Sequence, residues 1–291
     1  MARINIDGAQ NVEVSIKIPC EKTPLEQLEI MEAYIKAHQE SKDEDKAVRE
    51  LNCLKTIFPR LFRSIEENDL IAGRLDFLPI GFGSVTSIGG VGHYCVFHKL
   101  RAFKDTLEDE ELKKRVDVLY DYWQDNDVKS IYCQDVLNDT TTGRFIDCKY
   151  PFMATARLSG MMLDYKKLVR LGVNGLIDLI EKNESNTFME ACLKTMYLFK
   201  DVIRRQIELV KDAIEKTQDE QRLKDLHLMK EDLVYILDHK PATFHQALQL
   251  FWLYALCAGC INYGRMDIVL GPYLKHDIDT GLIDEDEAYR Y

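Results

Sequence analysis

Long apolar runs and concentrated positive charge are both missing from this 291-residue sequence. The longest nearly apolar stretch, residues 248–261, is shorter than the ~20 residues that a membrane-spanning helix needs. No basic start leads into an apolar core and a small-residue cleavage site. Lysine and arginine are interleaved with acidic residues, and the formal net charge is -11. The sequence therefore predicts a cytoplasmic protein that binds neither membranes nor nucleic acids.

Recognisable metal and nucleotide motifs are scarce as well. Eight cysteines are spread along the chain, which predicts reduced thiols and suits an anaerobic setting. Cys257 and Cys260 have the spacing of a metal or redox pair, but no second pair follows, so no metal site is expected. The glycine-rich residues 81–93 lack the lysine of a phosphate loop, which favours close backbone packing. His93 and His98 are either core histidines or acid–base groups.

Helical periodicity dominates what the sequence does contain. With 46% hydrophobic and 30% charged residues, the chain can bury a full core. Thr23, Pro24 and Glu26 supply a cap, a first-turn proline and a carboxylate, so a helix is predicted to begin there. Apolar residues recur at steps of three and four over residues 188–214, and a second helix follows a polar break at 217–221. Together they predict an antiparallel helical hairpin.

The last part of the chain is predicted to form the centre of the fold. Thr243 and Gln246 have the spacing of a capping box, and the residues that follow are apolar on nearly every face, as in a helix buried on all sides. Residues 266–270 are predicted to form a strand. Asp284 and Glu287 are predicted to begin another helix, and the sequence ends at Tyr291, about one turn into it. We therefore expect a truncated chain.

Three segments, in this order, resemble the glycyl radical enzyme family, and within it pyruvate formate-lyase. They are residues 70–74 (LIAGR), 164–172 (DYKKLVRLG) and 244–273, which contain FHQALQLFW and GRMD. Asp277 and Gly281 continue the pattern. The likeness covers most of residues 65–291.

The resemblance implies an α/β fold that is predominantly helical here. Residues 1–291 would be the N-terminal part of a ten-stranded barrel built from two half-barrels, namely the helical shell and the first half-barrel. Strands would be few and short. Residues 12–18 alternate apolar and polar side chains and are predicted to form a peripheral strand.

The resemblance also implies chemistry. The family cleaves C–C or C–heteroatom bonds of small molecules through a backbone glycyl radical, installed by a radical S-adenosylmethionine activase, and a thiyl cysteine. Members are lyases, dehydratases or acyltransferases, and a homodimer is implied. Neither the thiyl cysteine nor the radical glycine is present in this sequence, so it contains no catalytic residue. We expect no bound cofactor and no lyase activity from this chain alone.

Residues 259–265 correspond to the segment that lines the substrate pocket in the family. The resemblance makes Gly259, Cys260 and Asn262 candidate substrate-binding residues. The alternative is structural: Cys260 as a buried thiol at a helix end and Asn262 as a helix cap. Arg265 and Asp267 are predicted to form a structural ion pair.

A second candidate pocket segment precedes Asp164. Family members often carry a basic residue or histidine four positions before this aspartate, whereas this sequence has Gly160, followed by Met161. Because a desolvated carboxylate needs a charged partner, the missing cation argues against pyruvate as the substrate. Arg157 is a candidate substitute.

Two functions from different classes remain open at this point. The parent protein is a glycyl radical enzyme acting on a small polar substrate, or the chain is a non-catalytic paralogue half that binds a ligand or a partner. A helical scaffold of merely similar architecture is the third and weakest alternative, because it leaves the ordered segments unexplained.

Overall fold

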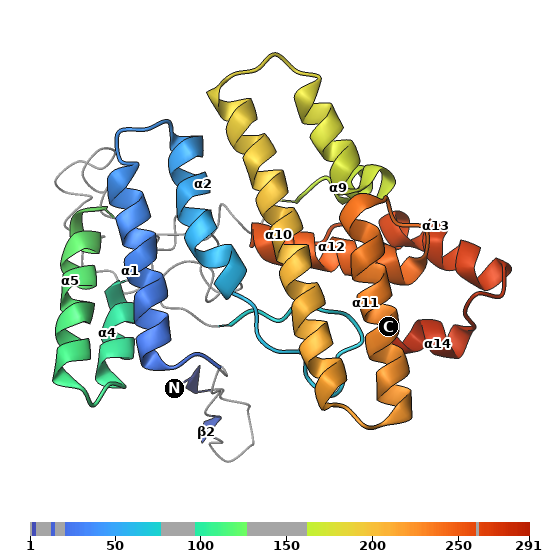
Figure 1. Cartoon of the computed structure of the whole chain (residues 1–291), viewed down its shortest axis with the longest axis horizontal. Helices are drawn as coiled ribbons and strands as arrows, with labels where there is room; N and C mark the ends of the chain where they lie inside the picture. Colours follow the sequence, from blue (N-terminus) through green and yellow to red (C-terminus); the bar gives the residue numbers. More distant parts are fainter. Residues whose placement is uncertain (1, 4–12, 15–20, 77–96, 127–161, 260–261) are drawn as a thin grey trace.

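The computed structural model describes residues 2–3, 13–14, 21–76, 97–126, 162–259 and 262–291. Helices make up most of this part of the chain, so the fold is predominantly helical, as predicted (Figure 1). The strands β1 (Ala2–Arg3) and β2 (Glu13–Val14) pair antiparallel. β2 lies inside the predicted strand at 12–18, whose remaining residues are outside the described ones. The barrel stays a prediction.

One group of helices is built from the first half of the chain and lies on the left in Figure 1. Its elements are α1 (Pro24–Glu40), α2 (Lys46–Ile57), the 3-10 turn η1 (Phe58–Arg60), α4 (Phe97–Asp105) and α5 (Glu110–Asn126). The predicted cap of α1 is confirmed, because the Glu26 amide donates to Thr23 Oγ1 and the Glu26 carboxylate accepts from the Thr23 amide. Trp123 is fully buried in this group, with its ring beside those of Tyr34 and His38.

The second group carries the second and third segments of the family resemblance. Its elements are α9 (Tyr165–Glu181), α10 (Thr187–Lys216), α11 (Glu220–Asp238), α12 (Phe244–Ala258), α13 (Met266–Asp279) and α14 (Glu285–Arg290). The predicted hairpin is confirmed: α10 and α11 pack side by side (Figure 1). The helix predicted to begin at Asp284 is confirmed as α14, which Asp284 caps.

Helix α12 is the centre of this group, as its apolar sequence predicted. It packs against α9, α10, α11 and α13. The capping box is confirmed, since the Gln246 amide donates to Thr243 Oγ1 and Gln246 Oε1 accepts from the Thr243 amide. The helix ends at Gly259, whose φ of 61° is left-handed and whose amide donates to the Leu256 carbonyl.

The predicted strand at residues 266–270 is wrong, because α13 begins at Met266. The helix continues through Gly271 and Pro272. Pro272 cannot donate to the carbonyl of Ile268. Ile268 is 51% exposed and Pro272 is also exposed, so water can satisfy that carbonyl and the helix tolerates the proline.

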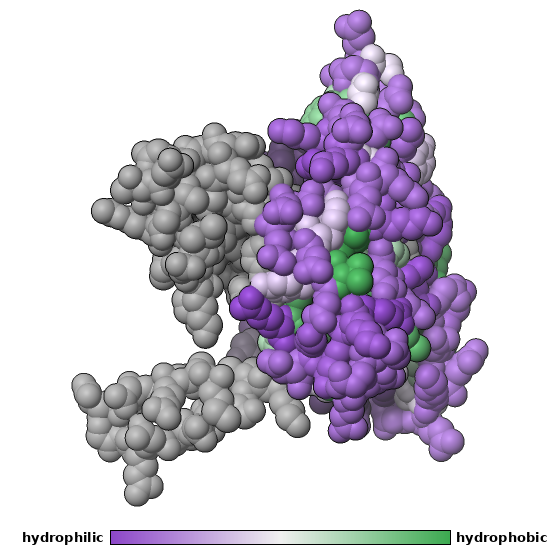
Figure 2. Space-filling model, turned by 90° about the vertical axis from the view of Figure 1, so that its left-hand side faces the viewer, coloured by the Kyte–Doolittle hydropathy of each residue, from purple (hydrophilic) through white to green (hydrophobic). Residues whose placement is uncertain are grey.

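The surface beside the first group is mostly hydrophilic. Figure 2 shows this side as mostly hydrophilic, with its most prominent hydrophobic patch near the middle and smaller ones towards the edges. None of the helices in the described ranges is both long and apolar enough to cross a membrane.

Candidate functional site

One stripe of α12 binds the backbone of residues 70–73, the first segment of the resemblance. The hydrogen bonds join three side chains, spaced i, i+4 and i+7, to four backbone groups: His245 Nε2 to Leu70 O (2.9 Å), Gln249 Nε2 to Ala72 O (2.9 Å), Ala72 N to Gln249 Oε1 (2.7 Å) and Trp252 Nε1 to Gly73 O (2.8 Å). The three side chains lie along one face of α12 and bind residues 70–73 in sequence order.

Gly73 allows this close approach. Its φ is +119°, and a Cβ there would lie 2.8 Å from Leu253 Cδ2 and 3.1 Å from Trp252 Cδ1. A side chain at this position would therefore push the segment off α12.

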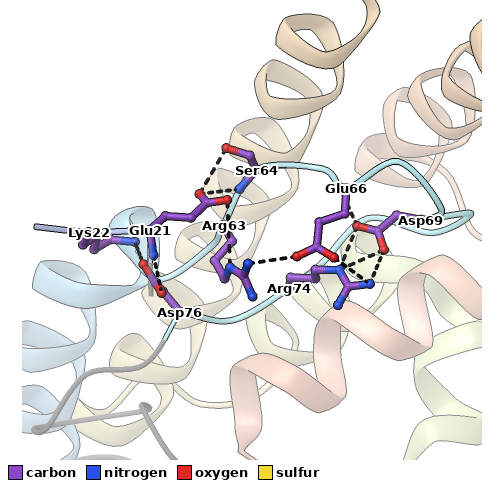
Figure 3. Close-up of polar contacts among 8 residues, drawn as sticks. All are labelled: Glu21, Lys22, Arg63, Ser64, Glu66, Asp69, Arg74 and Asp76. Carbon is purple, nitrogen blue, oxygen red and sulfur yellow. Dashed lines mark hydrogen bonds and ion pairs between the residues drawn. The ribbon is translucent and has the colours of Figure 1, made fainter. Parts of the chain in front are cut away.

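Residues 61–76, which we call the stitched loop, begin and end beside each other. The Asp76 amide donates to the Leu61 carbonyl at 2.7 Å, and Phe62 bridges Leu75. Figure 3 shows the ion pairs that hold the loop. They are Arg74 with Asp69 (2.6 Å) and Glu66 (3.5 Å), Arg63 with Glu66 (2.8 Å), and Lys22 with Asp76 (2.8 Å). Compact loops of this kind are frequently functional.

Helix α11 also binds the stitched loop. Arg222 donates to the carbonyls of Asp69 and Glu66, at 2.5 and 2.7 Å. Asp232 is buried and its carboxylate binds His245 Nδ1 at 2.5 Å. Because the Leu70 carbonyl can only accept, His245 Nε2 is the donor of that hydrogen bond.

The second segment of the resemblance packs on the opposite face of α12. Tyr165 stacks on Phe251 with a centroid distance of 4.0 Å. The Tyr273 hydroxyl of α13 donates to the Val169 carbonyl at 2.9 Å. All three segments therefore meet on α12.

Asp164 caps α9, and its carboxyl group makes the stability of the fold depend on pH. Its carboxylate binds Lys167 through the side chain and the backbone amide, and these bonds lower the pKa of the carboxyl group. A lowered pKa stabilises the fold above the unfolded-state pKa, and that stabilisation is lost as the pH falls through the folded-state pKa.

We expect Asp164→Asn, which keeps the cap but loses the charge, to be less stable than the wild type by about 0.5 kcal/mol at pH 7, because solvent screens the exposed pair. Urea unfolding should show this difference shrinking towards zero as the pH is lowered below about 4. A difference that is constant with pH would contradict the assignment.

Met162, the residue that follows the second candidate segment in the sequence, lies beside the residues that follow α12. Met162 and Asn262 form a parallel β-bridge. Asn262 Oδ1 accepts from the Gly264 amide at 3.0 Å, which holds residues 262–264 in a tight turn. Met162 Sδ lies against Gly264 so closely that a Cβ there would overlap it. Met162 therefore joins the chain before α9 to the chain before α13.

The predicted pocket residues fall partly outside the described part of the chain. Arg157, Gly160, Met161 and Cys260 lie outside it, as does His93, and nothing is described of the His98 side chain. Gly259 ends α12 and Asn262 lies at the bridge. The alternative role of Asn262, as the cap of α12, is wrong: the cap is Gly259, and Asn262 holds the turn before α13.

Arg265 and Asp267 form the predicted ion pair, with two contacts of 2.8 and 2.6 Å. Both side chains are largely exposed. The Asp267 carboxylate raises the pKa of Arg265, and Arg265 lowers that of Asp267. The Asp267 carboxylate thus neutralises the positive charge of Arg265, next to residues 262–264.

Cys257 is buried, and desolvation raises the pKa of its thiol well above the ordinary value. Cys192 is less buried and its pKa is raised for the same reason. Since the thiolate is the reactive form, we expect iodoacetamide at pH 8 to alkylate Cys192 at least ~10 times faster than Cys257 in the folded chain. Peptide mass spectrometry measures both rates. Equal rates would contradict the burial of Cys257.

Within the described ranges, no cluster of three or more candidate ligands could hold a metal ion.

Two open clefts lie away from the bridge. One, of about 520 Å³, lies between residues 65–68 and the turn of the α10–α11 hairpin, and the other, of about 510 Å³, lies near Arg60 and Arg205. Neither includes Met162 or residues 259–264. Both are lined mainly by charged and polar side chains, whereas small-molecule sites are mostly apolar.

Sequence reasoning missed Gln249, Trp252 and Met162. The sequence contained a signal for Gln249, which is a polar residue inside the nearly apolar stretch 248–261. In the structure its side chain is fully buried. A buried amide needs partners, so it marked a backbone contact. Met162 gave no signal, since its contact depends on a turn a hundred residues away.

A family model described as pyruvate formate lyase-like matches residues 4–291. The chain therefore belongs to the pyruvate formate lyase-like family of glycyl radical enzymes. It is 27% identical over 206 residues to (2S)-3-sulfopropanediol dehydratase of Klebsiella oxytoca, covering 62% of this chain and 25% of that protein. It is 29% identical over 137 residues to trans-4-hydroxy-L-proline dehydratase of Clostridioides difficile, covering 43% and 17%.

Solved structures show the same fold. A glycyl radical enzyme from Archaeoglobus fulgidus superposes with a TM-score of 0.68 at 21% identity, covering 90% of this chain and 36% of that one. The chain thus spans about a third of this solved relative, and its matches span a quarter or less of the curated ones.

Proposed function

We propose that the parent protein is a glycyl radical lyase or dehydratase that cleaves a C–C or C–heteroatom bond of a small polar substrate. The family membership and the dehydratases among the relatives support this. Residues 1–291 are then the N-terminal part of the ten-stranded barrel, and the thiyl cysteine and radical glycine are supplied by the rest of the parent. The chain alone has no lyase activity. A radical S-adenosylmethionine activase installs the radical, and the parent is a homodimer.

The observation that carries the proposal is the bridge between Met162 and Asn262. Met162 directly follows Gly160 and Met161 in the sequence, and Asn262 follows Gly259 and Cys260. The bridge thus supports one substrate pocket formed by Arg157, Gly160, Met161, Gly259, Cys260 and Asn262.

The first test is to sequence the locus beyond codon 291 and to record the electron paramagnetic resonance spectrum of the anaerobically activated parent. A glycine-type doublet is expected. A parent without a radical would overturn the proposal and favour a non-catalytic half that binds a ligand or a partner.

The second test addresses the pocket. We expect Asn262→Ala in the activated parent to lower kcat/KM at least ~10-fold for whichever probe is turned over, (2S)-3-sulfopropanediol or trans-4-hydroxy-L-proline, because one pocket hydrogen bond is worth about this much. The control is Val118→Ala, which changes an exposed residue of α5. Unchanged turnover of Asn262→Ala would remove Asn262 from the site.

A further inference from the structure

Trp252 contacts two segments that are far apart in the sequence. Its Nε1 donates to the Gly73 carbonyl at 2.8 Å, and its ring centroid lies 6.3 Å from that of Tyr263. Gly73 belongs to the stitched loop, and Tyr263 to the turn 262–264 that Met162 contacts. One indole thus lies between the loop and the candidate pocket.

The contact between Trp252 and the stitched loop leaves the indole and the loop little room to move independently. The indole is close enough to Gly73 that a Cβ there would come within 3.1 Å of Trp252 Cδ1. Gln249 holds both backbone groups of Ala72, and Arg74 is paired with Asp69. The loop backbone and the indole are therefore held as one packed unit.

The contact on the pocket side is made between aromatic rings. Tyr263 lies 6.3 Å from both Trp252 and Phe251, in tilted arrangements that aromatic pairs favour. The amide of the next residue, Gly264, donates to Asn262 Oδ1, and Met162 Sδ lies against Gly264. Displacing the indole removes one of the ring contacts that Tyr263 makes within the described ranges, and this weakens the support of the turn.

We propose that Trp252 is a positioning residue that couples the stitched loop to the turn 262–264. Only the description of this turn as part of a pocket rests on the proposed function, whereas the coupling is a property of the chain itself.

Hydrogen–deuterium exchange of the 291-residue chain tests the coupling. In Trp252→Phe, which loses the N–H and keeps an aromatic ring, amide exchange should rise at least ~3-fold in residues 70–76 and also in 262–264. Gly73→Ala, which touches no residue of the turn, should do the same. Peptides of α1 should stay at the wild-type rate, which separates local release from global unfolding.

The matched control is Trp123→Phe, which changes the other tryptophan, buried in the first helical group. It should leave the exchange of residues 262–264 at the wild-type rate. A rise confined to residues 70–76 in both test variants would overturn the coupling. A parent protein without a glycyl radical would overturn the proposed function and leave this exchange result unaffected.

Discussion

Gly172→Ala is expected to destabilise the chain by about 4 kcal/mol, because both the backbone and its surroundings exclude a side chain there. Gly172 has φ +68° and ψ 179°, a region that is essentially restricted to glycine. A Cβ would lie 2.8 Å from Lys240 Cα and 3.1 Å from the His239 carbonyl oxygen. These are backbone atoms, which cannot rotate away as the end of a side chain can. Urea unfolding followed by circular dichroism measures the loss.

Gly281→Ala is the matched control. Gly281 also has a positive φ, +69°, but no atom lies within 4 Å of its Cβ position. Its replacement should therefore cost only about 1 kcal/mol, the price of the left-handed backbone. Equal losses in the two variants would show that the clash with residues 239–240 contributes nothing.

Gly172, the last residue of the second segment of the resemblance, forms a kink in α9. It turns α9 against the end of α11, where Asn174 donates to the Asp238 carbonyl at 2.9 Å and Lys200 binds the Asp238 carboxylate at 2.8 Å. The Lys200 ammonium lowers the pKa of the Asp238 carboxyl group, and the Asn174 side chain adds a smaller effect in the same direction. Straightening α9 would pull apart this junction of three helices.

Gln249→Met is expected to cost about 3 kcal/mol of unfolding free energy. Methionine preserves the volume of the side chain but cannot hydrogen-bond Ala72, whose amide and carbonyl both bind Gln249. Ala72 is fully buried, so both groups would lose their partner where water does not reach. Each such loss costs about 1–3 kcal/mol. The measurement is again the urea unfolding curve.

Gln206 supplies the control for this prediction. It is a second fully buried glutamine, on α10, yet neither atom of its amide finds a partner in the described ranges. Gln206→Met should therefore be neutral or stabilise the chain by about 1 kcal/mol. A loss as large as that of Gln249→Met would mean that the Gln206 amide has a partner after all.

Local signals in the sequence predicted the helices well where they begin with a cap. Thr23 with Glu26 and Thr243 with Gln246 each contain a complete capping box within four residues, so no distant partner is needed to recognise them. The 188–214 stripe likewise carries its own periodicity, because a helix buries the same face at every turn.

The candidate site was predicted less completely. Asn262 and Gly259 were found through the family resemblance; Asn262 bridges Met162 and Gly259 caps α12, but their role in binding stays a prediction. The strand at 266–270 was wrong because a short apolar run is compatible with either a strand or a helix, and only packing against α12 and α9 distinguishes them.

The sequence by itself determined the helices with caps or long apolar periodicity, where the capped helices begin, and which family the chain belongs to. These depend on residues within a turn of each other, or on ordered motifs. The tertiary structure alone decided the partner of Gln249, 177 residues away, the bridge from Met162 to Asn262, and the kink at Gly172. The reason is physical: a buried polar group or a glycine must be satisfied or packed by whatever the fold brings beside it, and that neighbour is not adjacent in the chain.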